Sequence, residues 1–568
     1  MFSAKIDART LTSSRPLRWN LCTFSASLVL AAILLASCAG TKPSPSTAVI
    51  ERDTGSATRA ALKDMLDPTR APPQVLAFYS RRDFQPAWTD TSDQQEAATD
   101  VRAVLAHAHD QGLRDSEYAV SRNGGSRGKD AAQFEIALTG AVLRYARDVR
   151  AGRLPPGSVF EDVELPAKTF DAAAELNEAL EQHSLDVFFA GLPPAHPEYR
   201  RLMAALARYR GIADAGGWPE LTGTKEIPLN GMDPRRDALV KRLGAEDATI
   251  AAIANPSVND VRDAVKRFQA LNGLAQDGRV RGETLAALNV TAAARVAQIA
   301  ANLERWRWLP QRFEDRYVAV NVPDQSVQFV RNGAAILTSR VIVGRKASPT
   351  PITRTQIVAA VVNPPWNIPG DIAARDLLPQ LKRNPNFLAT KHMVVTDGPP
   401  NDPYGRTIDW RKVVAADFPY AIQQKPGPET ALGAVMLDSP NDFDVYLHDT
   451  PNKKRFEETD REISNGCVRV QQILPLASLA LTDDPMAGLP TLTKAVKTRD
   501  TQRLKLDKPL PVYFLYWTAI PNSDGSVAFR PDRYGRDATL IAALSKGQAV
   551  AKPIPDGKMD MPADEVSP

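Results

Sequence analysis

The chain has 568 residues, of which 43% are hydrophobic and 24% are charged, which is typical of globular proteins. At roughly 100–200 residues per domain, this length predicts about three to five domains. The 70 basic and 66 acidic residues give a net charge of +4, which excludes a protein that binds nucleic acid through bulk positive charge. Three cysteines exclude a disulfide-rich scaffold, and 45 prolines indicate turns, linkers and a β-rich portion.

The N-terminus has the pattern of a secretory signal. A basic head precedes an apolar run over 21–36, which is shorter than the about 20 residues that a membrane-spanning helix needs. The run ends in Leu-Ala-Ser-Cys, which resembles a bacterial lipobox and implies cleavage after residue 37 and lipidation of Cys38. The alternative is an uncleaved anchor. We expect a periplasmic lipoprotein, with the outer membrane favoured by analogy because Ala39, rather than aspartate, follows the cysteine.

The cysteine count then becomes informative. Cys22 lies inside the signal and Cys38 would carry lipid, so Cys467 is the remaining thiol. A lone cysteine in an oxidising compartment has no disulfide partner in its own chain. Either Cys467 is buried and inert, or its reactivity is the reason for its presence.

The regions that follow the signal differ in periodicity. Residues 38–60 are rich in Ser, Thr, Pro and Gly and predict a flexible tether. Residues 61–229 predict a helical scaffold, because apolar residues recur at three- and four-residue spacing. The predicted helices of this scaffold include 97–109, 131–150 and 198–214.

Residues 230–292 predict a compact unit with an amphipathic helix over 260–271, a turn, and a helix from Glu283. Its Phe-Gln, Gly-Leu, Asp-Gly, Thr-Leu and Leu-Asn pattern resembles the three-helix peptidoglycan-binding module. It departs from that pattern at Arg281 and Gly282, where the family usually has glycine and proline. The module either binds glycan or serves as a spacer.

A linker helix is predicted within 293–316, and from Tyr317 the periodicity becomes that of strands. Residues 317–520 predict a β-rich domain, interrupted at about 364–425 by a segment with a helix over 372–382. An excursion of this length is usually functional or disordered, and we interpret it as a lid. Residues 521–568 form a C-terminal extension with a tail, 553–568, that we expect to be disordered.

Two short segments carry the candidate chemistry. His448 precedes Cys467 by 19 residues, and a cysteine nucleophile needs a base or a positive neighbour. The backbone N–H groups of Gly466 and Cys467 could form an oxyanion hole. Arg469 offers a guanidinium fork for a substrate carboxylate, or else an ion pair that holds the loop.

These segments resemble the catalytic motif of L,D-transpeptidases of the YkuD fold. In that motif a histidine is followed by Ser-His-Gly-Cys and a later arginine or asparagine. The matching residues are His448, Ser464, Gly466, Cys467 and Arg469, while Asn465 replaces the second histidine. The unbroken Leu-His-Asp-Thr-Pro phrase over 447–451 and the scaffold's Phe-Gln-Pro-Ala-Trp stretch are typical of the large Gram-negative branch.

The resemblance implies a multidomain α+β protein: a β-rich YkuD-like catalytic domain with a helical capping insertion, an α-helical scaffold and a three-helix peptidoglycan-binding module. It implies that Cys467 is the nucleophile, His448 the general base and Gly466 an oxyanion-hole residue. The substrate would be bound by Arg469, Ser464, Asn465, Tyr446 and Trp366. Ser464 can instead support the loop, and Trp366 and Tyr446 can instead be core residues.

The implied reaction is a 3→3 cross-link between peptidoglycan stem peptides, formed through a cysteine thioester with release of D-alanine. No cofactor or metal is implied, and no nucleic acid; the partners are donor and acceptor stem peptides, glycan and a membrane. Hydrolysis of the thioester, exchange with a D-amino acid, and transfer to a protein lysine are alternatives. A non-catalytic murein-binding lipoprotein is another. A papain-like peptidase is disfavoured because its cysteine precedes its histidine in the chain.

Overall fold

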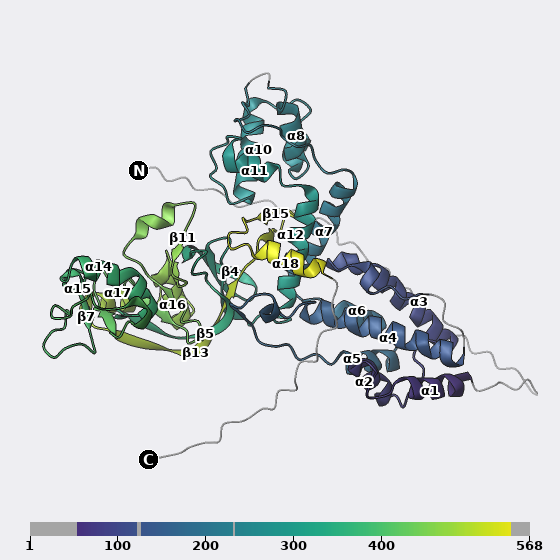
Figure 1. Cartoon of the computed structure of the whole chain (residues 1–568). Coiled ribbons are helices and arrows are strands. Elements are labelled where there is room, and N and C mark those ends of the chain that lie inside the picture. Colours follow the sequence, from purple (N-terminus) through teal and green to yellow (C-terminus); the bar gives the residue numbers. More distant parts are fainter. Residues whose placement is uncertain (1–53, 122–126, 231–232, 547–568) are drawn as a thin grey trace, which may run out of the picture. The chain divides into compact units, whose positions relative to one another are not determined.

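The computed structural model describes residues 54–121, 127–230 and 233–546 (Figure 1). The predicted signal, Cys38, most of the tether 38–60 and the predicted tail 553–568 lie outside the described residues. In the part of the chain that the structure describes, no single helix is long and apolar enough to cross a membrane. The bent pair Gly282–Leu288 and Ala292–Arg307 passes the same test only by length and composition.

The first region is helical, as predicted, and one buried carboxylate organises it. Glu135 accepts hydrogen bonds from the backbone N–H groups of Ala87 (2.9 Å) and Trp88 (2.8 Å) and from the Tyr79 hydroxyl (2.6 Å). The Phe-Gln-Pro-Ala-Trp stretch is therefore a core turn held by a helix. The helices are α1 (Thr54–Met65), α2 (Pro73–Arg81), α3 (Ser92–Ala106), α4 (Gly128–Ala151), α5 (Ala172–Glu181), α6 (Leu185–Gly191) and α7 (Pro197–Asp214), with 3-10 turns η1 (Ala108–Gln111), η2 (Asp115–Glu117) and η3 (Pro156–Ser158).

The small module that follows has its own apolar core. Its helices are α8 (Arg236–Gly244), the single-turn α9 (Ala248–Ala251), α10 (Val258–Leu271) and α11 (Gly282–Leu288). Gln269 at the end of α10 joins the parts: its Oε1 accepts from Gly278 N–H (2.9 Å) and its Nε2 donates to Thr284 Oγ1 (3.0 Å). The Phe-Gln and Asp-Gly positions of the motif thus hold the turn between two helices.

Helix α12 (Ala292–Arg307) is the predicted linker helix, and it bonds to regions on both sides of it in the sequence. The Trp306 ring stacks on Trp517, with centroids 4.3 Å apart and planes inclined by 13°. Glu304 accepts a hydrogen bond from the backbone N–H of Leu154 (2.9 Å). The buried length of α12 therefore joins the scaffold to the β-rich region that follows.

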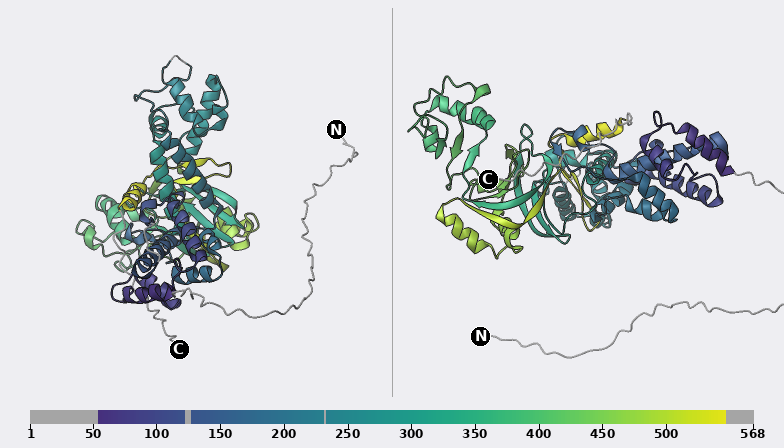
Figure 2. Two further views of the ribbon diagram at one scale, coloured as in Figure 1. Left: turned by 90° about the vertical axis from the view of Figure 1, so that its right-hand side faces the viewer. Right: turned by 90° about the horizontal axis from the view of Figure 1, so that it is seen from below.

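The β-rich region predicted over 317–520, called the catalytic region below after that expectation, is built on a sheet that closes on itself. The strand order is β5-β13-β2-β3-β4-β12-β10-β9, and β9 pairs again with β5. The scaffold strand β1 (Val163–Glu164) pairs in parallel with β5, and β11 pairs with β4. Figure 2 shows the strong curvature of the long strands. The strands are β2 (Arg316–Asn321), β3 (Ser326–Arg331), β4 (Ala334–Gly344), β5 (Ile352–Val362), β9 (Val435–Asp438), β10 (Leu447–His448), β11 (Glu462–Ser464), β12 (Val468–Val470) and β13 (Gln502–Leu515).

Alternating residues of β2 face two different cores. Val318 and Val320 lie in the core that fills the closed sheet, whereas Ala319 packs with residues of α7 and α12. The strand periodicity predicted from Tyr317 is confirmed by the three consecutive strands β2, β3 and β4. The remaining elements are η6 (Lys453–Glu457), α16 (Ile473–Thr482), α17 (Leu489–Thr498), β14 (Ala519–Pro521), β15 (Val527–Phe529) and α18 (Arg536–Ser545).

The insertion between β5 and β9 contains the predicted helix, but it is mixed rather than purely helical. A three-stranded sheet of order β6-β8-β7 accompanies the helices, and Trp410 lies in a separate apolar core. Strands β6 and β8 escaped the helical description because each has three residues. The elements are β6 (Trp366–Ile368), α13 (Gly370–Ile372), the π-helical η4 (Ala373–Leu377), α14 (Leu378–Arg383), α15 (Phe387–Thr390), β7 (Met393–Val395), the 3-10 turn η5 (Ala415–Asp417) and β8 (Ile422–Gln424).

Candidate active site

The candidate site is assembled by two adjacent parallel strands. In the β10–β12 register, His448 lies opposite Arg469 and Leu447 lies opposite Val468. Side chains alternate between the two faces of a strand, and paired residues face the same side. Leu447 and Val468 enter the core, so His448 and Arg469 share the other face. Cys467, two residues before Arg469, reaches that face as well.

The imidazole of His448 is oriented by a backbone carbonyl. Its Nδ1 lies 2.6 Å from the carbonyl oxygen of Asp449, an arrangement in which Nδ1–H donates and Nε2 keeps its lone pair. Burial lowers the pKa of His448 to about 4, and the positive charge of Arg469 adds to the effect. His448 is therefore neutral at neutral pH.

The thiol of Cys467 is half-buried, and its Sγ lies 3.5 Å from the carbonyl oxygen of Asp444. Burial raises the pKa of Cys467, while the positive charge of Arg469 opposes that rise. The resting pair is thus a neutral thiol and a neutral imidazole. A proton must leave the sulfur for nucleophilic attack, and Arg469 favours the thiolate that results.

Backbone bonds fix the loop before the cysteine. Gly466 has φ +114°, its N–H donates to Ser464 Oγ (3.2 Å), and Ser464 Oγ donates to the carbonyl of Cys467 (2.6 Å). Ser464 therefore supports the loop. Because the Gly466 N–H is already engaged, its predicted oxyanion role requires that this bond be shared. Among the described residues nothing accepts from the N–H of Cys467, which is the freer oxyanion donor.

The guanidinium of Arg469 is half-buried and forms no ion pair with any carboxylate of the described residues. Its Nε is buried without a hydrogen-bond partner there. The structure therefore offers no counter-ion for the alternative in which Arg469 holds the loop through an ion pair. An unpaired guanidinium beside a nucleophile suits a substrate carboxylate.

The other predicted substrate residues have different surroundings. Tyr446 lies close enough to be affected by Cys467, and its hydroxyl donates to Asp444 Oδ1 (3.2 Å). Asn465 is exposed and lies close enough to the carboxylate of Asp376, in the π-helical segment η4 of the insertion, to help lower the pKa of that group. Trp366 packs against the core of the insertion. The structure thus brings Tyr446 to the cysteine, links Asn465 to the insertion, and gives Trp366 a packing role.

Sequence reasoning missed Thr350, which is fully buried just before β5. Its Oγ1 donates to the carbonyl of Gly466 (2.7 Å) and accepts from the N–H of Gly344 (2.9 Å). The Tyr534 hydroxyl donates to the Gly344 carbonyl. These contacts join segments more than 100 residues apart, so no local pattern could reveal them.

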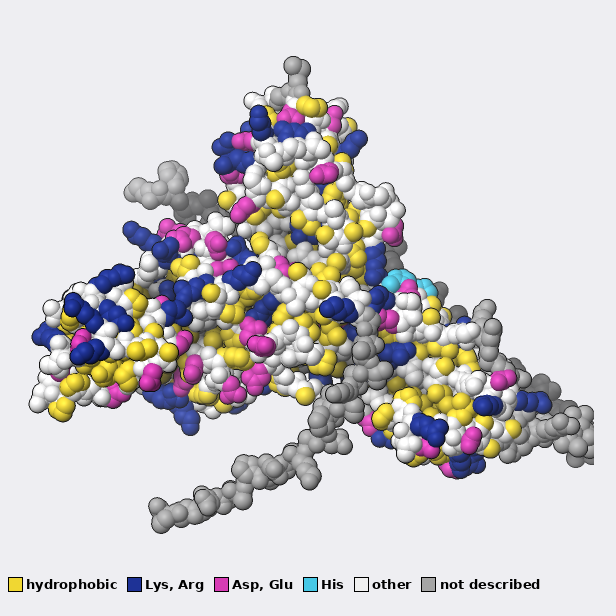
Figure 3. Space-filling model, in the orientation of Figure 1, with side chains coloured by type: hydrophobic (Ala, Val, Ile, Leu, Met, Phe, Trp, Pro, Cys, Tyr) yellow, Lys and Arg dark blue, Asp and Glu magenta, His cyan; other side chains and the backbone are white. Residues whose placement is uncertain are grey.

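No group of three or more His, Cys, Asp or Glu side chains suited to a metal ion occurs within residues 54–121, 127–230 and 233–546. On the face shown in Figure 3, basic and acidic side chains are interspersed.

Comparisons with known proteins agree with this arrangement. Residues 315–487 match the family described as "L,D-transpeptidase catalytic domain" (YkuD), residues 73–206 match "Scaffold domain", and residues 254–288 match "Putative peptidoglycan binding domain". A Haemophilus influenzae protein named "Putative L,D-transpeptidase" is 35% identical over 259 residues, which are 45% of this chain and 51% of that protein. The chain thus spans about half the length of this curated relative.

Among solved structures, the Ldtfm–avibactam carbamoyl enzyme is similar over 55% of this chain and 98% of its own chain. The identity is 11% and the TM-score is 0.18, so this likeness carries no weight for the site.

Proposed function

We propose that this chain, which carries a YkuD-type L,D-transpeptidase catalytic domain, forms 3→3 cross-links in peptidoglycan through a thioester on Cys467. The observation that carries the proposal is the parallel pairing of β10 with β12, which sets His448, Arg469 and Cys467 on one face. The regions that match the scaffold and the peptidoglycan-binding module support peptidoglycan as the substrate.

In the first half-reaction, His448 Nε2 takes the thiol proton of Cys467. The sulfur attacks the carbonyl carbon between the third and fourth stem residues, and the Cys467 N–H stabilises the developing oxyanion. The carbon–nitrogen bond then breaks, the imidazolium returns its proton to the leaving nitrogen, and D-alanine departs. An acyl thioester remains on Cys467.

In the second half-reaction, the side-chain amine of an acceptor stem peptide attacks the thioester. His448 accepts the proton from the attacking nitrogen and returns it to the departing sulfur of Cys467. The product is an amide between two third-position residues, and the free thiol is restored. The closeness of Asn465 to Asp376 supports a role for the insertion beside the nucleophile loop, where it can limit competing attack by water.

Mass spectrometry of one reaction tests this proposal. The full chain, in detergent, is incubated with a tetrapeptide-bearing muropeptide, and both the products and the intact protein are weighed. We expect a muropeptide dimer that has lost one D-alanine, together with a transient acyl adduct on the protein. Tripeptide monomer instead of dimer would make the enzyme an L,D-carboxypeptidase, and neither product nor adduct would favour a non-catalytic wall-binding protein.

Matched variants separate the roles of the two catalytic groups. Cys467→Ala should abolish both adduct and product, and His448→Asn should lower the rate by about 100-fold or more because general base catalysis is lost. His183→Asn makes the same change at an exposed histidine of the scaffold and should keep full activity. Equal activity of the two asparagine variants would contradict the base role of His448.

We further propose that Cys38 carries lipid and anchors the protein in the periplasm, at the outer membrane. The support is the Leu-Ala-Ser-Cys pattern and the Ala39 that follows it. Labelling with a radioactive fatty acid in cells should mark the native chain but not a Cys38→Ser variant. Label in both variants, or in neither, would contradict the lipid anchor.

A further inference from the structure

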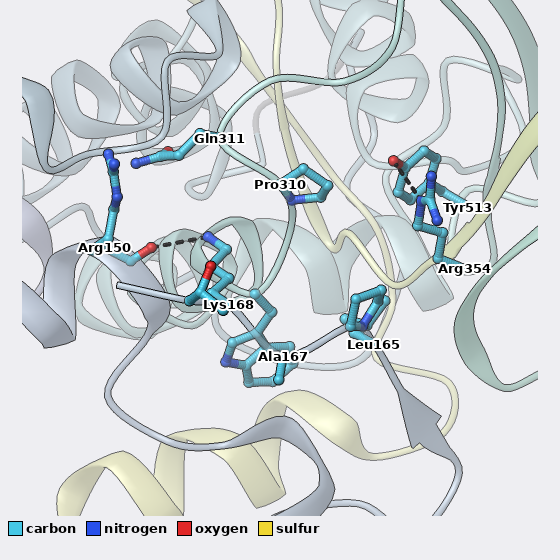
Figure 4. Close-up of a pocket in the computed structure, with 11 residues that line it drawn as sticks. Arg150, Leu165, Ala167, Lys168, Pro310, Gln311, Arg354 and Tyr513 are labelled. Atoms are coloured by element: carbon cyan, nitrogen blue, oxygen red, sulfur yellow. Dashed lines mark hydrogen bonds between the residues drawn. The ribbon is translucent and has the colours of Figure 1, made fainter. Parts of the chain in front are cut away.

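A cavity lies where the scaffold meets the catalytic sheet (Figure 4). Its volume is about 290 Å³. Arg150, at the end of α4, and Lys168, from the loop before α5, lie across it from Arg354 of β5 and Tyr513 of β13. Trp308 and Pro310, which follow α12, complete much of the wall. Neither His448 nor Cys467 lines this cavity.

The cavity is cationic and its charges are incompletely balanced. No carboxylate is among its lining residues. Arg354 pairs with Glu314, but within the described ranges neither Lys168 nor Arg150 forms an ion pair. The Lys168 ammonium donates to the carbonyl of Arg150 (2.9 Å) and to that of Arg307, which leaves its third N–H free. An anion in the cavity would supply the missing counter-charge.

The lowered pKa of Lys168 agrees with the absence of a negative counter-charge beside its ammonium group. Burial, together with the neighbouring charges of Arg150 and Arg307, lowers the pKa of Lys168 to about 7. Glu304 opposes this effect, but its carboxylate is already paired with Arg307 (3.0 Å). A carboxylate beside Lys168 would favour its charged form.

An unsatisfied acceptor adds a second requirement. Gln311 donates from Nε2 to the carbonyl of Leu192 (3.1 Å), and its Oε1 is buried without a hydrogen-bond partner in the described chain. Buried polar atoms are normally hydrogen-bonded, so this oxygen calls for a donor. In Figure 4 the Gln311 side chain lies beside the tip of Arg150. The Gln311 oxygen has no accessible surface, so the cavity presents two cationic side chains, Lys168 and Arg150, beside apolar walls.

We propose that this cavity binds a small organic carboxylate of the size of a dipeptide, with its carboxylate held by Lys168 and Arg150. A volume of about 290 Å³ equals that of roughly ten waters, at about 30 Å³ per water in the liquid. The Trp308, Pro310 and Tyr513 walls suit an organic body better than a bare inorganic anion. This site is separate from the cysteine site and stands whether or not the proposed transpeptidase reaction occurs.

Calorimetric titration of the full chain with D-alanyl-D-alanine tests the proposal. The dipeptide carries a carboxylate, N–H donors and two methyl groups. We expect binding that Lys168→Met weakens about tenfold or more, because a charge-assisted hydrogen bond is lost. Lys129→Met, at an exposed lysine on the first turn of α4, should leave the affinity unchanged. D-alanyl-D-alaninamide, which lacks the carboxylate, should not bind.

Several results would overturn the proposal: no binding at millimolar dipeptide, equal binding of the amide, or equal affinity in a folded Lys168→Met variant. Inorganic phosphate that displaced the dipeptide with equal affinity would also overturn the organic class of ligand. Circular dichroism checks the fold of each variant. If Lys168→Met fails to fold, Arg150→Gln should show the same weakening, and an unchanged affinity there would overturn the site.

Discussion

The protonation states of His448 and Cys467 determine how the candidate site depends on pH. Since burial lowers the pKa of His448 to about 4, the imidazole stays a competent base well below the ordinary value of about 6.5. At pH 5, kcat/KM should keep about nine-tenths of its plateau value, whereas an unshifted histidine would leave about 3%. A pH–rate profile from pH 4 to 8 checks this, and an acid limb with its midpoint near 6.5 would contradict it.

The same shift has a consequence for stability. The folded state holds His448 neutral and the unfolded state does not, so the unfolded chain binds more protons between the two pKa values. The stabilising contribution is complete above about pH 6.5 and is lost as the pH falls toward about 4. Urea unfolding of the native chain and of His448→Asn should therefore differ less at pH 4.5 than at pH 7.

Thr350 is a positioning residue for the nucleophile loop. Thr350→Val keeps the shape but leaves the Gly466 carbonyl and the Gly344 N–H without their partner. Each buried unpaired group costs about 1–3 kcal/mol, so the free energy of unfolding and kcat should both fall. Thr350→Ser retains the hydroxyl and should restore most of both. A loss of activity in the serine variant as large as in the valine variant would contradict the hydrogen-bond explanation.

At the scale of the element, the insertion is separable from the closed sheet. The end of β5 pairs directly with the start of β9, Val362 opposite Val435, and the two cores share no residue. Replacing residues 366–424 by a short glycine-serine loop should therefore leave the sheet folded. If the insertion limits access of water, tripeptide monomer should increase several-fold relative to cross-linked dimer.

Product analysis beside circular dichroism checks this prediction. An unchanged ratio of hydrolysis to transfer in the folded deletion variant would show that the insertion does not protect the thioester. Asp376→Ala is a milder comparison, because it removes a single carboxylate of the insertion, which lies close to Asn465 and pairs with Arg375 (2.9 Å). Exposed pairs are worth about 0–1 kcal/mol, so this variant should keep its melting temperature.

Helices and strands with a local periodicity could be predicted from the sequence, whereas features that depend on pairing between distant strands could not. The predicted helix over 260–271 and the alternation of Val318 and Val320 were readable because each pattern lies within one element. Strand β1 has two residues, and the closure of the sheet depends on β9 returning to β5. Neither leaves a local signal.

The candidate site shows the same limit. The motif pointed to His448 and Cys467, but their spacing contains no information on strand pairing. Only the β10–β12 register puts them on one face, and only the fold brings Thr350 to Gly466. The Gly466 N–H, which was predicted to stabilise the oxyanion, already donates a hydrogen bond to Ser464 Oγ. A linear motif does not encode this competing bond.

For the whole molecule, α12 makes the scaffold and the catalytic sheet depend on each other. Arg307 is buried, pairs with Glu304 (3.0 Å) and donates to the Tyr199 hydroxyl (3.0 Å). The preceding residue on the same helix, Trp306, stacks on Trp517. A substitution at Arg307 should therefore destabilise both regions at once.

Arg307→Met should lower the free energy of unfolding by about 3–5 kcal/mol, because it leaves the Glu304 carboxylate buried without its cation. Adding Glu304→Gln removes that charge and should recover part of the loss. Urea unfolding followed by tryptophan fluorescence, circular dichroism and residual activity should give coincident transitions in every variant. Separate transitions, with activity that survives the loss of scaffold helix, would mean that the catalytic sheet folds independently of α12. They would also mean that the pairing of β1 with β5 contributes little to the stability of the sheet.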